Sequence, residues 1–263
     1  MTSVIAWLAV DSRHPTALYF ASDSRQTFPD GSLSDSCVKL YAVDGGHDIF
    51  AFSGDVDFAS VALRAACEGM EAGAIPAGLT TSAYGKAEWL RDQFNKRLEA
   101  VVMRPRYRTS ILHGTRQSWG QTATFVIHRF SIEAAADRIA CDEVLHDQDG
   151  STVVTIDGSG TVHVGKHVSQ EAARAGNFSR AFFAGFCESI AARKDPCSGG
   201  PIQLVGIGDK GVAMHFGVVT SEGAFFRAAA VTDDLPYVKW RDAKLQNVDR
   251  FGSLIRGAQV HAW

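Results

Sequence analysis

Short apolar runs, rich in branched and aromatic residues, recur through the first fifty positions of the chain. Residues 3–10, with the sequence SVIAWLAV, are typical of a buried strand. Residues 11–15 carry Asp, Ser and Pro and predict a turn, and residues 17–21 predict the returning strand. Apolar runs at 38–43 and 48–52 predict two more strands. The chain is therefore expected to begin as a set of neighbouring strands.

Two helices are expected next, because apolar residues recur there at steps of three and four. Asp55 or Asp57 can cap the first helix, since a carboxylate accepts hydrogen bonds from the free amides of the first turn. Thr81 or Ser82 can begin a longer second helix, whose apolar positions extend over residues 84–101.

The second half of the chain changes from strands to a helix and back to strands. Apolar residues at helical spacing over 181–190 predict the helix. The alternation in Thr161-Val-His-Val-Gly is more typical of a strand. The basic residues over 104–108 and Arg116 are expected in a solvated loop that joins a helix to a strand. Strands are expected at about 122–129, 137–145, 151–156, 202–207, 212–219 and 224–231.

Length and charge limit the classes of function. The chain has 263 residues, of which 46% are hydrophobic, and a formal net charge of −3. We expect one domain over residues 1–232 and an extension over residues 233–263, which packs on its own or a neighbouring subunit. The small net charge favours neither a nucleic acid nor an anionic membrane as partner. No apolar run approaches the roughly 20 residues that cross a bilayer.

The cysteines and histidines predict no bound group. Five cysteines, an odd number without CxxC spacing, favour reduced thiols over a disulfide framework or a zinc site. The histidines form no HExxH pair, and Gly206-Ile-Gly208 lacks the third glycine of a dinucleotide-binding turn. Asp11 interrupts the first apolar stretch too early for a signal peptide. We therefore expect a cytoplasmic protein that needs no metal and no cofactor.

Thr2 is the first candidate for chemistry. Removal of Met1 would place a hydroxyl nucleophile and a free α-amine on this one residue. The amine has a pKa of roughly 8, so near neutral pH part of it can accept the hydroxyl proton. A threonine that uses its own terminal amine as the base is a recognised form of activated oxygen nucleophile.

Asp23 and Lys39 form a second candidate pair. Lys39 stands at the start of an apolar run, where burial of its charge is costly without a partner. Asp23 follows the strand expected at 17–21 and is the nearest suitable partner if the two strands are neighbours. From the residues alone, this pair can serve catalysis or can be an ordinary structural ion pair.

These residues and one later element resemble the proteasome β-type subunits, which are N-terminal-nucleophile (Ntn) hydrolases. The resemblance is carried by Thr2, Ala-Ser-Asp-Ser-Arg at 21–25, Val-Lys-Leu at 38–40 and Ser53-Gly54, and by Asp195-Pro-Cys-Ser198-Gly-Gly near the second group of strands. The separation of Asp23 from Lys39 is the same as in the family. The match covers residues 2–220 and points to a bacterial proteasome homologue, of the HslV type or more divergent.

The resemblance implies a role for the first three residues. Thr2 Oγ would attack an amide or peptide carbonyl. Lys39 would lie beside that oxygen, and its positive charge would lower the pKa of the nucleophile and of the terminal amine. Asp23 would hold the lysine charged and in place.

The resemblance implies further roles around this centre. Ser159, Asp195 and Ser198 would form a hydrogen-bonded group around the α-amine, although Ser159 can also lie in a plain hairpin turn. The backbone N–H of Gly54 would stabilise the oxyanion, a contribution of roughly 3 kcal/mol for one such donor. Thr27 would pair its backbone with an extended peptide by strand addition.

The resemblance also implies the fold and the assembly. The fold would be an α+β four-layer αββα sandwich, in which two antiparallel sheets are flanked by helices. The subunits would form a homo-oligomeric assembly of stacked rings that hydrolyses peptides or unfolded protein, with an ATP-dependent unfoldase as a candidate partner. Two other functions stay open, an Ntn amidase that acts on a small acyl-amide and a catalytically silent scaffold.

Overall fold

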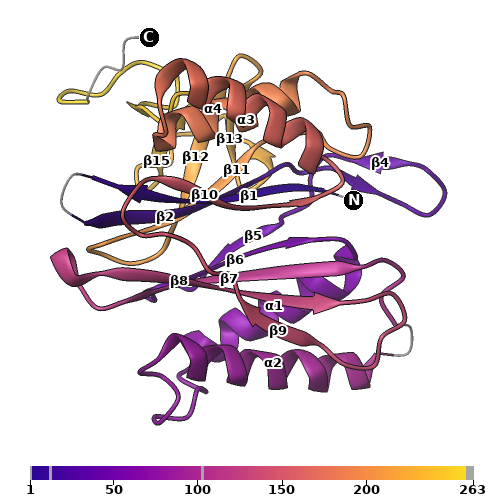
Figure 1. Cartoon of the computed structure of the whole chain (residues 1–263). Coiled ribbons are helices and arrows are strands. Elements are labelled where there is room, and N and C mark those ends of the chain that lie inside the picture. Colours follow the sequence, from indigo (N-terminus) through magenta and orange to yellow (C-terminus); the bar gives the residue numbers. More distant parts are fainter. Residues whose placement is uncertain (1, 12–13, 102–103, 259–263) are drawn as a thin grey trace.

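Two large sheets contain most of the strands of the protein. The structure is a computed structural model that describes residues 2–11, 14–101 and 104–258. Within these residues one sheet has nine strands, a second has five, and a third joins β3 (Gln26–Thr27) to β4 (Leu33–Ser34) (Figure 1). The expected removal of Met1 and the end of the expected extension, residues 259–263, lie outside the described residues.

The nine-stranded sheet begins with the first two strands of the chain. Its order is β10-β1-β2-β11-β12-β13-β14, with β15 beside β12 and β16 beside β15. Neighbours are antiparallel except β12 and β15, which are parallel. The strands are β1 (Ser3–Val10), β2 (Pro15–Ser22), β10 (Thr152–Gly158), β11 (Gln203–Gly208), β12 (Met214–Thr220), β13 (Gly223–Phe226), β14 (Ala229–Ala230), β15 (Lys239–Asp242) and β16 (Asn247–Val248).

The five-stranded sheet is antiparallel throughout and has a central strand that the sequence analysis missed. Arg116 lies in this strand, β7, and is buried rather than in a solvated loop, so that prediction was wrong. Its guanidinium donates to the carbonyls of Gly208 and Gly211, each at 2.7 Å, which compensates the buried charge. The strands, in order, are β5 (Leu40–Ala42), β6 (Asp48–Ser53), β7 (Thr109–Gln117), β8 (Thr124–Ile132) and β9 (Ala140–Glu143).

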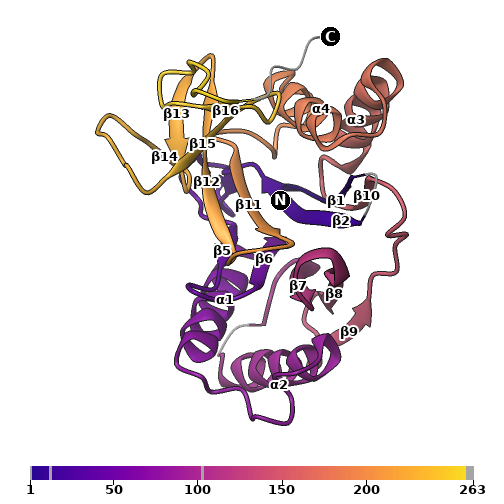
Figure 2. The same ribbon diagram turned by 90° about the vertical axis from the view of Figure 1, so that its left-hand side faces the viewer.

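The two helices expected in the first half are confirmed and their caps are identified. Helix α1 (Val56–Glu71) is capped by Asp55, whose carboxylate accepts from the N–H of Phe58. Helix α2 (Ala83–Ala100) is capped by Ser82, whose hydroxyl oxygen accepts from the N–H of Gly85. Both helices pack on the outer face of the five-stranded sheet (Figures 1 and 2).

The strand expected at 161–165 is wrong, because these residues begin helix α3 (Thr161–Ala175). Val164 and Val168, four residues apart, lie on one helix face and are buried, whereas Val162 is exposed. The alternation of valines therefore did not reflect the burial pattern. Helix α4 (Ser179–Ala191) confirms the helix expected over 181–190 and packs with α3 on the nine-stranded sheet (Figure 1).

A shared apolar core joins the two large sheets. Phe20 and Val205 of the nine-stranded sheet and Ile49, Leu112 and Phe125 of the five-stranded sheet belong to one buried cluster. The sequence prediction of a mixed α and β chain with antiparallel sheets is confirmed at this level. The structure has more sheet than was predicted, since β15 and β16 add to one side of the nine-stranded sheet. The pair β12–β15 is parallel, whereas the prediction was of antiparallel sheets.

Part of the expected extension joins the nine-stranded sheet. Strand β15 pairs with β12, and Trp240 of β15 packs over Gly217, where a Cβ atom would overlap the indole ring. A division of the chain at residue 232 and contact of its end with a neighbouring subunit stay predictions. Among the described residues, none of the helices combines the length and the apolar character needed to cross a membrane.

A buried polar network lies between α2 and the five-stranded sheet. Lys86 Nζ contacts the two carboxylate oxygens of Asp48 at 3.0 and 2.7 Å, and His113 Nε2 lies 2.8 Å from Asp48 Oδ1. Burial raises the pKa of Asp48, but the hydrogen bonds and charges of His113 and Lys86 outweigh it and hold that pKa below its ordinary value. His128 stacks beside His113, and burial together with the charge of His113 lowers the pKa of His128 to about 4.

Replacement of His128 by phenylalanine is expected to flatten the pH dependence of stability. The ordinary pKa of this imidazole is 6.5 and its folded pKa is about 4, so as pH falls the unfolded chain binds the proton first. The folded state of the wild type therefore loses stability between pH 6.5 and pH 4. Denaturant titrations at pH 7, 6, 5 and 4 should give His128→Phe a shallower loss, and an unchanged slope would contradict the assignment.

Candidate active site

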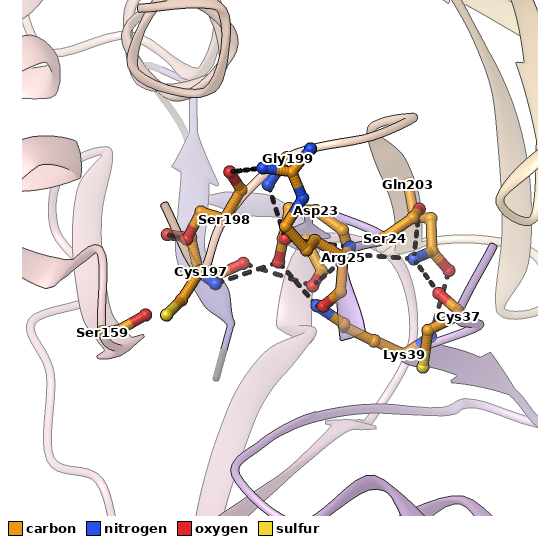
Figure 3. A network of polar contacts seen from close by, with 12 residues as sticks. Asp23, Ser24, Arg25, Cys37, Lys39, Ser159, Cys197, Ser198, Gly199 and Gln203 are labelled. Carbon is orange, nitrogen blue, oxygen red and sulfur yellow. Dashed lines mark hydrogen bonds and ion pairs between the residues drawn. The ribbon is translucent and has the colours of Figure 1, made fainter. Parts of the chain in front are cut away.

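The polar residues that the sequence singles out lie at the ends of different strands. Thr2 precedes β1, Asp23 follows β2 and Lys39 precedes β5. Gly54 follows β6, and Ser159 follows β10. Hydrogen bonds bring several of these ends together with the loop between α4 and β11, as Figure 3 shows.

The carboxylate of Asp23 is the centre of this arrangement. Its Oδ1 accepts hydrogen bonds from the N–H of Ser3 at 3.0 Å and from Lys39 Nζ at 2.8 Å. Its Oδ2 accepts from the N–H groups of Arg25 at 3.1 Å and Gly199 at 2.9 Å. Two donors on each oxygen satisfy the hydrogen-bonding capacity of an ionised carboxylate. One side chain therefore joins the start of β1, the end of β2 and the α4–β11 loop.

Lys39 is fully buried together with Asp23. Besides Asp23, its ammonium donates to the carbonyl oxygen of Arg25 at 2.5 Å. Among the described residues no third acceptor contacts this ammonium, so one of its three N–H donors is not engaged. The expected ion pair between residues 23 and 39 is thus present, and burial makes it costly to break.

A second polar cluster forms around Asp195. Its Oδ2 accepts from the hydroxyls of Ser159 and Ser198, each at 2.7 Å, and its Oδ1 accepts from the N–H of Cys197 at 3.0 Å. Partial burial raises the pKa of the Asp195 carboxyl, but these three hydrogen bonds outweigh burial and keep the pKa below its ordinary value. The three residues that the sequence grouped together therefore meet, and Ser159 lies at the start of α3 rather than in a hairpin.

Ser3 belongs to the same cluster, although the sequence analysis treated it only as part of a strand. Its Oγ lies 2.7 Å from Ser198 Oγ. Because the single hydroxyl proton of Ser198 goes to the carboxylate of Asp195, Ser3 is the donor of the pair. The backbone of Ser3 contacts Asp23 and its side chain contacts Ser198, so this residue connects the two polar clusters.

Thr2 borders a cavity of about 410 Å³ that is also lined by Ser53, Gly54 and Ser159. The residue is fully buried, and its Oγ1 has no hydrogen-bond partner in the described part of the chain. A buried hydroxyl without a partner is costly in an ordinary core. Thr2 thus borders the cavity, while its hydroxyl oxygen is covered and unpartnered among the described residues.

Gly54 is required by its backbone and by its surroundings. Its φ of +107° disfavours every other residue, and an added Cβ would lie 2.7 Å from Thr109 Cα and overlap the carbonyl of Arg108. The glycine thus lets the chain that follows β6 pass directly beside β7, on the wall of the Thr2 cavity.

Thr27 lies apart from that cavity. Its backbone is paired with Leu33 in the β3–β4 ribbon, and its Oγ1 is buried without a partner among the described residues. Addition of a peptide strand at Thr27 stays a prediction.

Arg25 and Asp35 brace the loop that carries Ser198, a role the sequence analysis did not assign. The guanidinium of Arg25 forms a two-bond pair with the carboxylate of Asp35, at 2.8 and 2.9 Å, and also donates to the carbonyls of Pro196 and Ser198 at 3.3 and 3.5 Å. The hydrogen bond with Asp35 raises the pKa of Arg25, and the same bond lowers the pKa of Asp35. The resemblance motif contains Arg25, but no pattern in the sequence identifies Asp35.

Gln203 forms hydrogen bonds with the segment that carries Lys39, and the sequence analysis did not identify this residue. Its Nε2 contacts the carbonyls of Asp23 and Cys37 at 3.0 and 2.9 Å and the hydroxyl of Ser24 at 3.0 Å. Its Oε1 accepts from the N–H of Lys39 at 3.1 Å (Figure 3). A buried amide that bonds to two segments, residues 23–24 and 37–39, fixes their relative positions. A glutamine inside an apolar strand was the available signal.

The described residues include no group of three or more His, Cys, Asp or Glu side chains that could hold a metal ion. All five cysteines are free thiols.

The comparison with solved structures finds a similar fold. Anbu (ancestral beta-subunit) from Yersinia bercovieri is similar with a TM-score of 0.53, over 89% of each chain, at 14% sequence identity. At this identity the similarity concerns the fold alone. No protein-family model matches the chain, and no curated protein matches it.

These findings correct the family assignment made from the motifs. The chain was identified as a proteasome β-type homologue, of the HslV type or more divergent. No family model supports that identification, and the similarity found is to the fold of Anbu. Short motifs with matching separations therefore did not establish the family, because they comprise few of the residues of the chain.

Replacement of Gly160 by alanine is expected to disrupt the site without removing any polar group. An added Cβ at Gly160 would overlap Ser3 Oγ and lie 3.1 Å from Ser198 Oγ. We expect a loss of about 1–3 kcal/mol in the free energy of unfolding, as for other overpacked positions. Thermal and denaturant unfolding measure this loss.

Gly165→Ala is the matched control, since Gly165 lies in α3 and an added Cβ would meet only Ile156 Cδ1, at 3.8 Å. This variant should be as stable as the wild type or about 0.5–1 kcal/mol more stable. Equal stability of the two variants would contradict the close packing around Ser3.

Proposed function

We propose that the protein is a threonine-type amide hydrolase, a peptidase, in which Thr2 is the N-terminal nucleophile after removal of Met1. The observation that carries the proposal is the shared oxygen of Asp23, which accepts from the N–H of Ser3 at 3.0 Å and from Lys39 Nζ at 2.8 Å. Because Ser3 directly follows Thr2, this oxygen holds the buried ammonium close to the terminal residue.

The unengaged groups fit this chemistry. Thr2 Oγ1 is buried without a partner in the described part of the chain, and one N–H of the Lys39 ammonium has no acceptor there. A lysine charge beside the hydroxyl stabilises the alkoxide that forms when the proton leaves. Asp23 keeps the lysine in position for this task.

The reaction proceeds in two stages. The freed α-amine of Thr2 accepts the Oγ1 proton while Oγ1 attacks the carbonyl carbon of the substrate amide. The N–H of Gly54 donates to the oxyanion. The C–N bond then breaks, the proton passes to the leaving amine, and an ester remains on Thr2. Water attacks this ester with the amine again as base, which releases the acid and restores the hydroxyl.

The cluster around Asp195 holds the terminal residue in place. Ser159 and Ser198 donate to Asp195, and Ser198 accepts from Ser3, so the polypeptide next to the α-amine is fixed by hydrogen bonds. A base held in one orientation needs little reorganisation when it takes up the proton. We assign Ser159, Asp195 and Ser198 to this positioning role and Thr27 to substrate pairing.

The finer fold and the assembly are part of the same proposal. The helix pairs on the outer faces of the two sheets support a four-layer αββα sandwich of the Ntn-hydrolase type, with residues 233–263 as an extension. The likeness to Anbu, an ancestral beta-subunit, supports a homo-oligomeric ring. A peptide or unfolded protein is the proposed substrate. A cytoplasmic location and an unfoldase partner stay predictions.

Intact-mass measurement and the Thr2→Ala variant test the nucleophile. We expect a mature chain that starts at Thr2 and hydrolyses peptides from a mixed-sequence fluorogenic library. Thr2→Ala should lower kcat/KM by at least about 1,000-fold, because the attacking oxygen is gone, while Thr2→Ser should keep part of the activity.

Retention of Met1, or equal turnover by Thr2→Ala, would exclude this mechanism. Turnover of small acyl-amides alone would identify an amidase, and no turnover of either class would favour a silent scaffold.

Two lysines that pair with buried aspartates, Lys39 fully buried and Lys86 partly buried, allow a matched test of the ion pair. Lys39→Met removes the ammonium that pairs with Asp23, and Lys86→Met removes the ammonium that pairs with Asp48. Each change leaves a buried carboxylate without its lysine and should cost about 3–5 kcal/mol of unfolding free energy. Only Lys39→Met should abolish turnover in the fraction that remains folded, which circular dichroism quantifies. Equal losses of turnover per folded molecule would show that Lys39 is merely structural.

A further inference from the structure

The cavity beside Thr2 has a wall without any wholly apolar side chain among the described residues. Ser53, Ser110, Ser159 and Thr161 contribute hydroxyl groups, and Gly54 contributes backbone. The cavity, at about 410 Å³, has room for one polar residue of a substrate.

Arg129 supplies one positive charge on this wall. Its Nη2 donates to Thr155 Oγ1 at 2.5 Å and to Asp157 Oδ1 at 3.2 Å, while Ser110 donates to Asp157 Oδ2 at 3.1 Å. Both oxygens of Asp157, the one carboxylate that lines the cavity, are therefore engaged. The Nε of Arg129 is buried and has no partner in the described part of the chain, so this arginine still lacks an acceptor.

Arg108 is the second arginine among the residues that line the cavity, and its backbone lies next to Gly54. Its backbone passes so close to Gly54 that a Cβ there would overlap its carbonyl oxygen. The guanidinium pairs with Glu133 at 3.2 Å, and the two side chains are 72% and 69% exposed. Exposed pairs of this kind are weak. The Arg108 guanidinium can therefore exchange Glu133 for a substrate carboxylate inside the cavity with little loss of free energy.

We propose that the Thr2 cavity selects a substrate residue that carries a carboxylate next to the scissile amide. Two arginines against one carboxylate, Asp157, give the cavity wall a formal charge of +1. A carboxylate accepts hydrogen bonds from guanidinium groups with good geometry, whereas a lysine or arginine of the substrate would be repelled. The proposal rests on the proposed function, because it names the substrate class of the same site.

Paired fluorogenic peptides that differ at one position test this selectivity. In the first set of peptides, Glu, Gln, Leu or Lys occupies the position whose carbonyl is attacked. In the second set, the same four residues occupy the position that follows the cleaved bond. In one of the two sets we expect kcat/KM for Glu to exceed that for Gln about tenfold, with Leu and Lys lower still. A wild type that cleaves all four equally in both sets, or prefers Leu, would overturn the proposal.

Arg108→Gln tests the contribution of this arginine to the selectivity, and because its side chain is exposed the variant is expected to fold as the wild type does. The preference for Glu over Gln should fall toward unity, with a smaller change in the turnover of the Gln peptide. Arg91→Gln is the control, because Arg91 is a half-exposed arginine on α2 that also pairs with a glutamate. The control should keep the wild-type preference, and the same loss in both variants would reduce the effect to overall charge.

Binding to Thr2→Ala separates this proposal from the proposed function. This variant cannot turn substrate over, so calorimetric affinity for the Glu and Gln peptides reports selection alone. We expect about tenfold tighter binding of the Glu peptide, and less difference at 0.5 M salt because ions screen the contact. Equal affinity would overturn the carboxylate selectivity. Selective binding by a wild type that cleaves nothing would instead overturn the hydrolase and leave the acidic ligand class standing.

Discussion

The four hydrogen bonds to the Asp23 carboxylate hold the candidate site together. They join the backbone at the start of β1, the backbone after β2, the loop after α4 and the ammonium of Lys39. These segments are far apart in sequence and belong to both sides of the shared core. A buried carboxylate is tolerated because every acceptor site is used. The geometry of this carboxylate fixes the start of β1 relative to Lys39, and the proposed chemistry depends on this arrangement.

Two lysine–aspartate pairs show that the groups around an ammonium determine whether all of its N–H donors are engaged. Lys39 and Lys86 each contact one buried aspartate at 2.7–2.8 Å. Lys86 is a residue of α2 and donates its third hydrogen bond to Thr115, so its donors are engaged within the protein. Lys39 keeps one donor without an acceptor among the described residues. The two pairs differ in the number of acceptors around the ammonium. The Nζ–carboxylate distance and the burial of the pair do not reveal this difference.

Much of the fold could be predicted from the sequence, because it depends on local patterns. The periodicity and caps of α1 and α2, and the apolar runs of β1 and β2, follow from neighbouring residues. The errors arose where distant groups decide the outcome. Arg116 enters a strand because carbonyls of another sheet accept its donors, and α3 was hidden by an accidental alternation of valines. In the site, Asp23, Lys39, Ser159, Asp195 and Ser198 were located, whereas Ser3, Asp35 and Gln203 act through contacts that only the folded chain creates.

Glycines at the site restrict how its chemistry can diverge. At Gly54, Gly158 and Gly160 the space for a Cβ is already filled by Arg108, Thr2 and Ser3 respectively. Evolution cannot remodel these backbone segments by single substitutions without displacing the residues they enclose. Arg108, whose guanidinium extends into solvent, is free of that constraint. Substitutions at the exposed Arg108 can therefore alter the rim of the cavity, whereas the backbone packed around Thr2 tolerates little change.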